Sequence, residues 1–185
     1  IYLQNVLGLT TLQTGLMMLP GGLIMGLCAP VVGRLYDRVG PRPLLVPGVI
    51  AVSAVMWALT MVSQYTPIWG VIAGHIVLSI GLAFTFTPLF TSSMSSVPPK
   101  FYSHASAILG SVQQVAGAAG IALFVAVMSL QTASGAAAGL GEVDALAAGI
   151  RAGFFCGAVV SVLMIVAAFF VKRPEGGHGG PAMGH

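Results

Sequence analysis

The chain has 185 residues, of which 57% are hydrophobic and only 6% are charged, and its formal net charge is +3. A soluble domain typically carries about a quarter of charged residues, so this composition excludes an ordinary soluble fold and indicates that lipid is the main solvent. The seven Lys and Arg residues are spread along the chain and form no basic patch, which argues against nucleic acid as a partner.

Five apolar segments are long enough to cross the hydrocarbon core of a bilayer, which takes about 20 helical residues. Lipid offers no hydrogen-bond partners to backbone amides, so each segment should be an α-helix. The predicted fold class is therefore all-α, a polytopic membrane bundle of about five helices. The expected spans are residues 14–35, 43–62, 68–97, 103–130 and 149–171.

Three segments lie outside these spans. Residues 1–12 are too few to cross a membrane and too apolar for a free tail, so we expect the outer end of a helix that begins upstream, in a longer protein. The Ala- and Gly-rich stretch 131–148 is expected to be mobile or a short surface helix. Residues 174–185, rich in Gly and His, are expected to be a disordered tail without a metal site.

The basic residues predict how the helices are oriented. Cytoplasmic loops carry an excess of Lys and Arg, and here six of the seven basic residues fall on one side of the expected spans. Only Arg151 falls on the other side, together with the acidic pair Glu142 and Asp144. The hinge between the first two spans and the C-terminus should therefore be cytoplasmic. The six residues on that side are Arg34, Arg38, Arg42, Lys100, Lys172 and Arg173.

Small residues in the spans predict helices that pack against one another. Gly70 and Gly74 form a small-xxx-small pair in the third span. Gly110, Gly117 and Ile121 share one stripe of the fourth span, along which another helix can approach closely. This pattern is typical of a bundle rather than of single lipid anchors.

No catalytic constellation is visible, and no acidic residue lies within a span, so we expect neither an enzyme nor a bound cofactor or metal. The polar side chains at depth are His75, Gln113 and Gln114, which should face the bundle interior or a wet cavity. His75, with Ser79 one turn later, either binds substrate or protons or is hydrogen-bonded to a neighbouring helix. For the two glutamines, a place in the cavity wall and interhelical hydrogen bonding are equally favoured.

The ten residues from Gly33 to Arg42 hold four of the eleven acidic and basic residues, and they lie between two long uncharged stretches of sequence. Gly40 can adopt a positive φ at a helix end, and proline after it prevents the helix from continuing. Asp37 is suited to a helix N-terminus, and the basic residues Arg38 and Arg42 can pair with it or with lipid headgroups. The spacing is more specific than a charged turn that only sets topology would require.

This hinge resembles the signature cytoplasmic loop of the major facilitator superfamily, which recurs in both halves of those transporters. The departures are Tyr36, where a small residue is usual, and Pro41, where a basic residue is common in the N-terminal copy. The matching residues are Gly33, Leu35, Asp37, Arg38, Gly40 and Arg42.

Other stretches resemble the fourteen-span drug:proton antiporter branch of that superfamily, and the likeness covers nearly the whole chain except the tail. Gln113 stands where many members have a basic residue, which weakens a charge-based role there. The stretches are Tyr2-Leu3-Gln4 with Gly8, Thr14-Gly15-Leu16, Leu19-Pro20-Gly21-Gly22, and residues 81–88, 97–99 and 105–122.

The resemblance implies the C-terminal part of a proton-coupled exporter of multiple drugs or toxic compounds in a bacterial inner membrane. It implies a small amphipathic or hydrophobic substrate, protons, lipid and a missing N-terminal lobe of the same chain as partners. The segment would supply half of the substrate cavity and a second cytoplasmic gate loop. The gate residues would be Gly33, Asp37, Arg38, Gly40 and Arg42, and the cavity candidates are His75, Phe86, Gln113 and Gln114.

Two alternatives stay open at this point. One is a facilitator for another solute, such as a sugar, a peptide or a siderophore. The other is a small stand-alone membrane protein that assembles with partners through its glycine stripes. A membrane enzyme is disfavoured by the missing catalytic residues.

Overall fold

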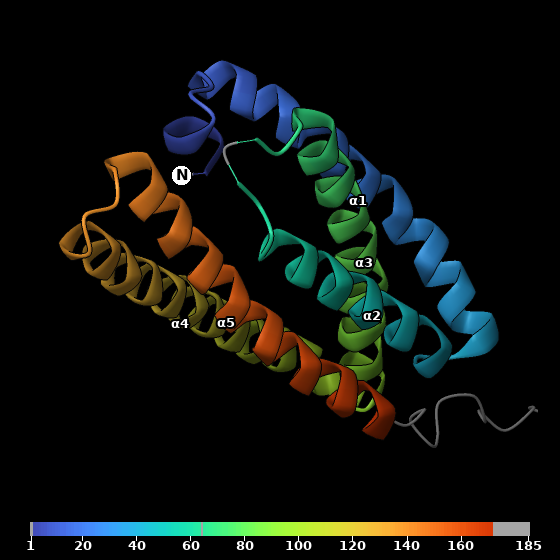
Figure 1. The fold of residues 1–185 in the computed structure, drawn as a ribbon. Helices are drawn as coiled ribbons and strands as arrows, with labels where there is room; N and C mark the ends of the chain where they lie inside the picture. The colour runs from blue at the N-terminus through green and yellow to red at the C-terminus, as the bar shows by residue number, and fades with distance from the viewer. Residues whose placement is uncertain (1, 64, 172–185) are drawn as a thin grey trace, which may run out of the picture.

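The computed structural model describes residues 2–63 and 65–171, and these residues form helices without a β-strand (Figure 1). All five long helices are apolar and long enough to cross a bilayer, which confirms the predicted all-α membrane bundle. Two short turns accompany them, a π-helical turn (Tyr2–Val6) and a 3₁₀ turn (Pro99–Phe101). The helices are α1 (Thr11–Val39), α2 (Arg42–Leu59), α3 (Ile68–Ser95), α4 (Tyr102–Ala137) and α5 (Glu142–Phe170).

Local sequence signals set the two ends of α1. Its N-cap is Thr10, whose hydroxyl accepts a hydrogen bond from the Gln13 backbone N–H at 3.3 Å, while the Gln13 side chain accepts one from the Thr10 N–H at 2.9 Å. This reciprocal pair is a capping box. At the other end Gly40 has a φ of 82°, and its N–H donates to the Tyr36 carbonyl at 2.8 Å. Pro41 then starts a new direction for the chain.

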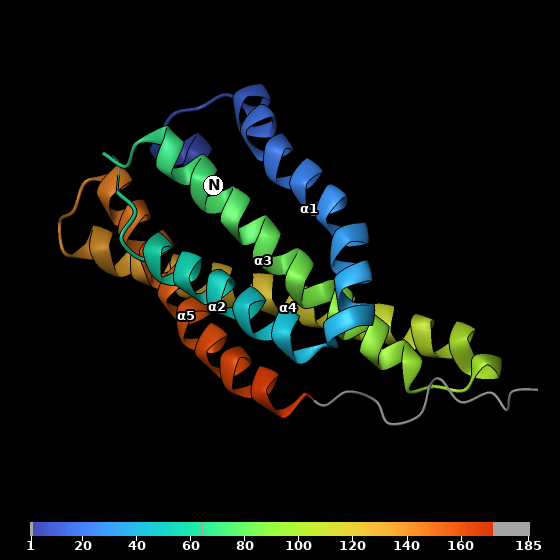
Figure 2. The same cartoon turned by 90° about the vertical axis from the view of Figure 1, so that its right-hand side faces the viewer.

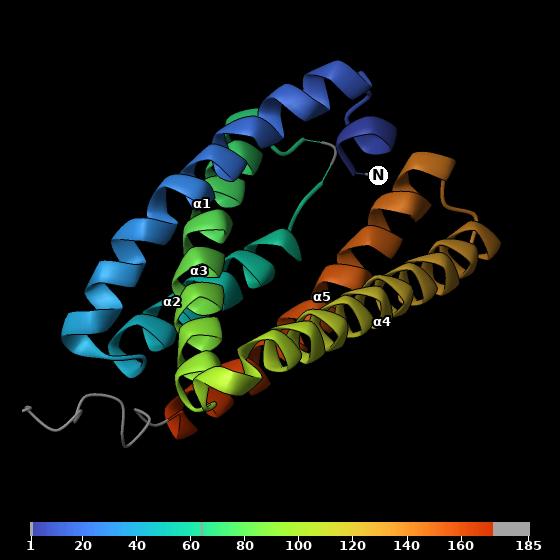
Figure 3. The same cartoon turned by 180° about the vertical axis from the view of Figure 1, so that it is seen from behind.

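The five helices are arranged as two arms joined by α2. Helices α1 and α3 pack along each other in one arm, and α4 and α5 in the other (Figures 2 and 3). Helix α2 packs against both α3 and α5 and so connects the arms. Although α3 and α4 follow each other in the sequence, they touch only slightly, and the arms stay apart over most of their length (Figure 3).

Glycines without side chains let the helices approach where they cross. At the α2–α3 crossing, a Cβ placed on Gly81 would stand 2.9 Å from the Gly48 carbonyl oxygen. At the α4–α5 crossing, a Cβ on Gly149 would stand 3.2 Å from the Thr132 backbone nitrogen. The stripe expected to approach another helix behaves differently, because Cβ atoms at Gly110 and Gly117 would meet nothing within 4 Å in the described part of the chain.

The expectation for residues 131–148 is wrong. Helix α4 continues to Ala137 and α5 already begins at Glu142, so a short turn replaces the expected mobile loop or surface helix. Alanine has the highest helix propensity, and acidic residues in the first turn of α5 interact favourably with its dipole. Gly135 also lies against Ala145, so both helices pack together up to their ends. The expected tail 174–185 lies outside the described residues, as do Lys172 and Arg173.

Candidate functional site

The structure offers two candidate functional features, the charged hinge between α1 and α2 and a hollow between α3 and α4. The hinge residues Gly33, Asp37 and Arg38 belong to the last two turns of α1, and Arg42 is the first residue of α2. Gly40 and Pro41 form the buried turn between them. The side chains of Asp37 and Arg38 are exposed.

Arg42 attaches the hinge to the far end of the chain. Its guanidinium donates a hydrogen bond to the backbone carbonyl of Phe169, in the last turn of α5. The last carbonyls of a helix have no partner within the helix, and a cation is favourable at that end. Next to this contact, Leu45 and Val49 of α2 pack with Ala168 of α5 in a small buried cluster.

Asp37 makes no ion pair with either hinge arginine. No residue in the described ranges takes part in a hydrogen bond or salt bridge with its carboxylate. Asp37 lies near the C-terminal end of α1, where the helix dipole disfavours a negative charge. The carboxylate is therefore available for contacts beyond this end of α1.

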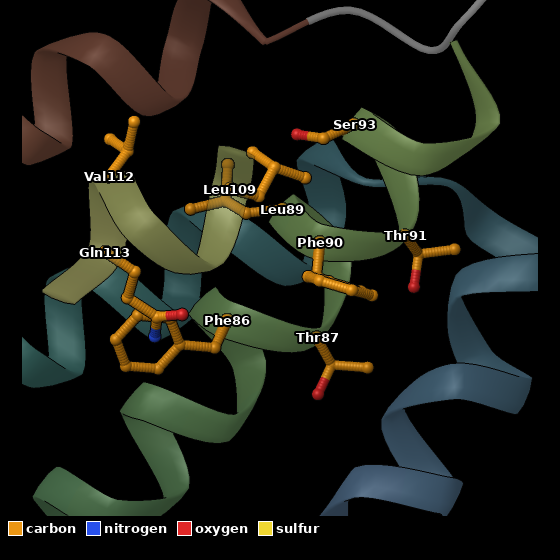
Figure 4. Close-up of a pocket in the computed structure, with 9 residues that line it drawn as sticks. All are labelled: Phe86, Thr87, Leu89, Phe90, Thr91, Ser93, Leu109, Val112 and Gln113. Carbon is orange, nitrogen blue, oxygen red and sulfur yellow. The ribbon is translucent and has the colours of Figure 1, made fainter. Parts of the chain in front are cut away.

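The hollow lies between the C-terminal half of α3 and the N-terminal half of α4 and has a volume of about 490 Å³ (Figure 4). Its wall combines aromatic and aliphatic side chains with hydroxyl groups and one amide, and none of the lining residues is charged. The lining residues are Phe86, Thr87, Leu89, Phe90, Thr91, Ser93, Leu109, Val112 and Gln113.

Helical periodicity explains why these side chains share one space. Phe86 and Phe90 are four residues apart on α3, and so are Thr87 and Thr91, which places each pair on one face one turn apart. The two rings are 43% and 52% exposed, because no other described element covers them. A ligand with an apolar body and a few hydrogen-bonding groups fits such a wall.

The hollow brings together two of the four cavity candidates, Phe86 and Gln113 (Figure 4). Gln114 is exposed on α4 and is not among the lining residues. The lining residues that the sequence analysis missed include Thr87, Phe90 and Thr91. In residues 86–91 the two Phe residues are four positions apart, and so are the two Thr residues. This helical spacing is the signal that would have pointed to the missed residues.

His75 lies elsewhere, at the contact between α1 and α3. Its Nε2 atom is 3.2 Å from the Met18 carbonyl oxygen of α1, the geometry of a hydrogen bond between helices. The buried Ser79 hydroxyl donates to the His75 carbonyl at 2.8 Å. Both side chains face Gly21, where a Cβ would stand 2.7 Å from the Ser79 Oγ atom. Of the two alternatives for His75, this geometry matches hydrogen bonding to a neighbouring helix.

The described residues contain no group of three or more His, Cys, Asp or Glu side chains that could hold a metal ion. Fold and site together define a multi-pass membrane protein, with five spanning helices and a largely apolar hollow open to one side.

Comparison with known proteins identifies the family. A family model described as "Major Facilitator Superfamily" matches residues 1–121, which include the hinge and the hollow. The chain belongs to this superfamily, as the sequence analysis predicted.

Curated relatives cover most of the chain. "Lincomycin resistance protein LmrB" from Listeria monocytogenes serovar 1/2a is 35% identical over 95% of this chain and 38% of its own length. The protein of the same name from Bacillus subtilis (strain 168) is 34% identical over 96% of the chain and 38% of its length. "Puromycin resistance protein pur8" from Streptomyces alboniger is 31% identical over 72% of the chain and 27% of its length. The chain thus spans less than two fifths of the length of these relatives.

Proposed function

We propose that the chain is the C-terminal part of an exporter that expels antibiotics and other amphipathic or hydrophobic compounds across a bacterial plasma membrane in exchange for protons. The observation that carries this proposal is the hollow of about 490 Å³ between α3 and α4. The printed names of the relatives, which refer to lincomycin and puromycin resistance, favour a drug over a sugar, a peptide or a siderophore.

In this proposal the hollow is one half of the substrate cavity. Phe86 and Phe90 provide flat apolar surfaces for the body of the substrate, since aromatic side chains bury large areas. Thr87, Thr91 and the Gln113 amide provide hydrogen bonds that orient it. The other half of the cavity comes from the part of the relatives' length that this chain does not cover. Gln114, exposed on the neighbouring face of α4, is a further candidate for that shared wall.

The hinge is the proposed cytoplasmic gate loop. Transporters of this kind rock two lobes around a central site. Arg42 fixes the hinge to α5, whereas the exposed Asp37 and Arg38 are free to make contacts with the other lobe that form in one state and break in the next. Gly40, with a φ of 82°, gives the backbone the conformation that this turn requires. A Cβ at Gly33 would meet nothing within 4 Å in the described residues, so that position of α1 is open to the other lobe. This assignment places the hinge and the C-terminus in the cytoplasm, as the excess of basic residues on that side favours.

Proton coupling needs a titratable group at depth, and the five helices offer no acidic side chain in their central turns. We therefore assign the coupling carboxylates to the other lobe. His75, which lies outside the hollow, is assigned the structural task of holding α1 against α3, since its ring nitrogen faces the Met18 carbonyl.

The test uses inside-out membrane vesicles that contain the native full-length protein. Radiolabelled lincomycin should accumulate in the vesicles when a proton gradient is imposed, and a protonophore should abolish the accumulation. Vesicles from cells without the protein are the control. Equal accumulation in both preparations would contradict drug export, and accumulation that persists with the protonophore would contradict proton coupling alone.

A further inference from the structure

A second hollow, at the opposite end of the bundle from the hinge, contains the lone basic residue of that side. We call it the Arg151 hollow. It has a volume of about 600 Å³ and lies between the C-terminal end of α2, α4 and α5. Its lining residues are Thr60, Val127, Gln131, Arg151, Ala152, Phe155 and Cys156.

The sequence of α5 sets the depth of Arg151 in the bilayer. The 20 residues that follow it, 152–171, carry no charge. At about 1.5 Å per residue they extend about 30 Å, which is the thickness of the hydrocarbon core. Arg151 therefore lies at the edge of that core, at the level of the lipid glycerol and phosphate groups. The Trp57 ring is in edge contact with the Phe155 ring, with 5.8 Å between the ring centroids. Tryptophan is a residue typical of this interfacial level.

The side chains of the hollow change from polar to apolar along the membrane normal. Helices α4 and α5 run antiparallel, and Gly149 lies against Thr132, so Gln131 and Arg151 are at similar depth. One turn deeper, about 6 Å toward the hinge end, the same two faces present Val127 and Phe155. The hollow thus has hydrogen-bond donors at the phosphate level and an apolar wall at the level where acyl chains begin.

The Arg151 guanidinium is available to an anion from the membrane. Among residues 2–63 and 65–171, no carboxylate or carbonyl oxygen accepts a hydrogen bond from its guanidinium. At this level the exposed guanidinium reaches the headgroup region, where the phosphates of anionic lipids attract a cation. The guanidinium offers two parallel N–H donors that match two phosphate oxygens, and the Gln131 amide adds another donor.

We propose that the Arg151 hollow binds an anionic phospholipid of the leaflet opposite the hinge. Arg151 and Gln131 hold the phosphodiester, and an acyl chain lies against Val127 and Phe155. The lining contains no carboxylate to receive an ammonium group, so the site selects a headgroup such as glycerol over one that carries a positive charge. The site is separate from the proposed substrate hollow and does not depend on drug export.

The test is native mass spectrometry of the full-length protein in detergent with added phosphatidylglycerol or phosphatidylcholine. The unmodified protein should retain phosphatidylglycerol preferentially. Arg151→Ala should reduce the bound fraction at least fivefold. Arg151→Lys should reduce it less, because the lysine ammonium keeps the positive charge but lacks the two parallel N–H donors of the guanidinium. Lys100→Ala, which removes an exposed basic residue from the hinge side, should leave it unchanged.

Two further measurements keep the proposal falsifiable. Val127→Trp fills the apolar part of the Arg151 hollow and leaves Arg151 intact. It should also reduce lipid retention, and this result does not depend on how well the Arg151→Ala variant folds. Inorganic phosphate at millimolar concentration should not displace the lipid. Full retention in both Arg151→Ala and Val127→Trp, an equal loss in Lys100→Ala, or displacement by free phosphate would overturn the proposal.

Discussion

The guanidinium of Arg42 donates a hydrogen bond to the backbone carbonyl of Phe169, so the first residue of α2 is attached to the last turn of α5. The two residues are 127 positions apart in the sequence. Because α2 also packs against α3, this contact joins the hinge to both arms of the bundle. The hinge is therefore anchored on one side, and its exposed Asp37 remains available for contacts that change.

The first prediction concerns this anchor. Arg42→Ala should lower the free energy of unfolding by about 1 kcal/mol, because the last carbonyls of α5 lose a cationic partner at an exposed site. The Tm should fall with it. The measurement is thermal unfolding of the purified protein in detergent. Arg34→Ala, an exposed arginine of the same hinge without a hydrogen bond to α5, is the control. Equal melting temperatures for both variants would contradict the anchor.

The second prediction concerns the substrate hollow. Phe86→Ala removes a ring that lines the hollow and is 43% exposed, and the loss of its contact with substrate should cost about 1–2 kcal/mol. The KM for lincomycin export should therefore rise roughly 5- to 30-fold with little change in kcat. Phe170→Ala, an exposed phenylalanine at the end of α5, is the matched control and should leave KM unchanged. An unchanged KM in Phe86→Ala would remove Phe86 from the site.

The third prediction concerns the gate. Asp37→Asn should lower the rate of export about fivefold, equivalent to about 1 kcal/mol for a charge at a helix end, without lowering the amount of protein in the membrane. Export in vesicles and immunoblotting of the same membranes measure both quantities. Glu142→Gln removes an acidic residue at the opposite side of the bundle and should not affect export. Normal efflux from a well-expressed Asp37→Asn variant would exclude the gate role.

The sequence predicted the fold well, since charge and hydropathy decide it. Lipid leaves helices as the only economical backbone structure, and long uncharged stretches mark them without reference to tertiary contacts. The same reasoning failed for residues 131–148, where high Ala and Gly content was interpreted as a loop. In the structure, the fit of Gly135 against Ala145 stabilises helix on both sides of a short turn.

The candidate site could be predicted only in part, because its geometry depends on how helices are placed in space. Phe86 and Gln113 were identified as single residues, and they line one hollow because the fold brings the C-terminal half of α3 beside the N-terminal half of α4. The contact of His75 with the Met18 carbonyl joins two residues that are 57 positions apart on different helices, and no sequence periodicity encodes it. Thr91 is recognised as a lining residue only when α3 is seen to turn the face that carries both Thr87 and Thr91 toward the hollow.

The last prediction concerns the crossing of α2 and α3, which holds α3 in place beside the hollow. A Cβ on Gly81 would stand 2.9 Å from both the Gly48 carbonyl oxygen and the Val52 Cγ2 atom, so the two helices must move apart to admit it. Gly81→Ala should therefore lower the free energy of unfolding by about 1–3 kcal/mol, as overpacking does.

Gly26→Ala is the matched control on α1, since a Cβ there meets nothing within 4 Å in the described residues. Alanine has the higher helix propensity, so this variant should be neutral or gain up to about 1 kcal/mol. Chemical unfolding in mixed micelles compares the two variants with the unmodified protein. Because α3 carries six of the nine residues that line the hollow, Gly81→Ala should also raise the KM for lincomycin. A stable Gly81→Ala protein with unchanged transport would show that the crossing has more space than the backbone positions indicate.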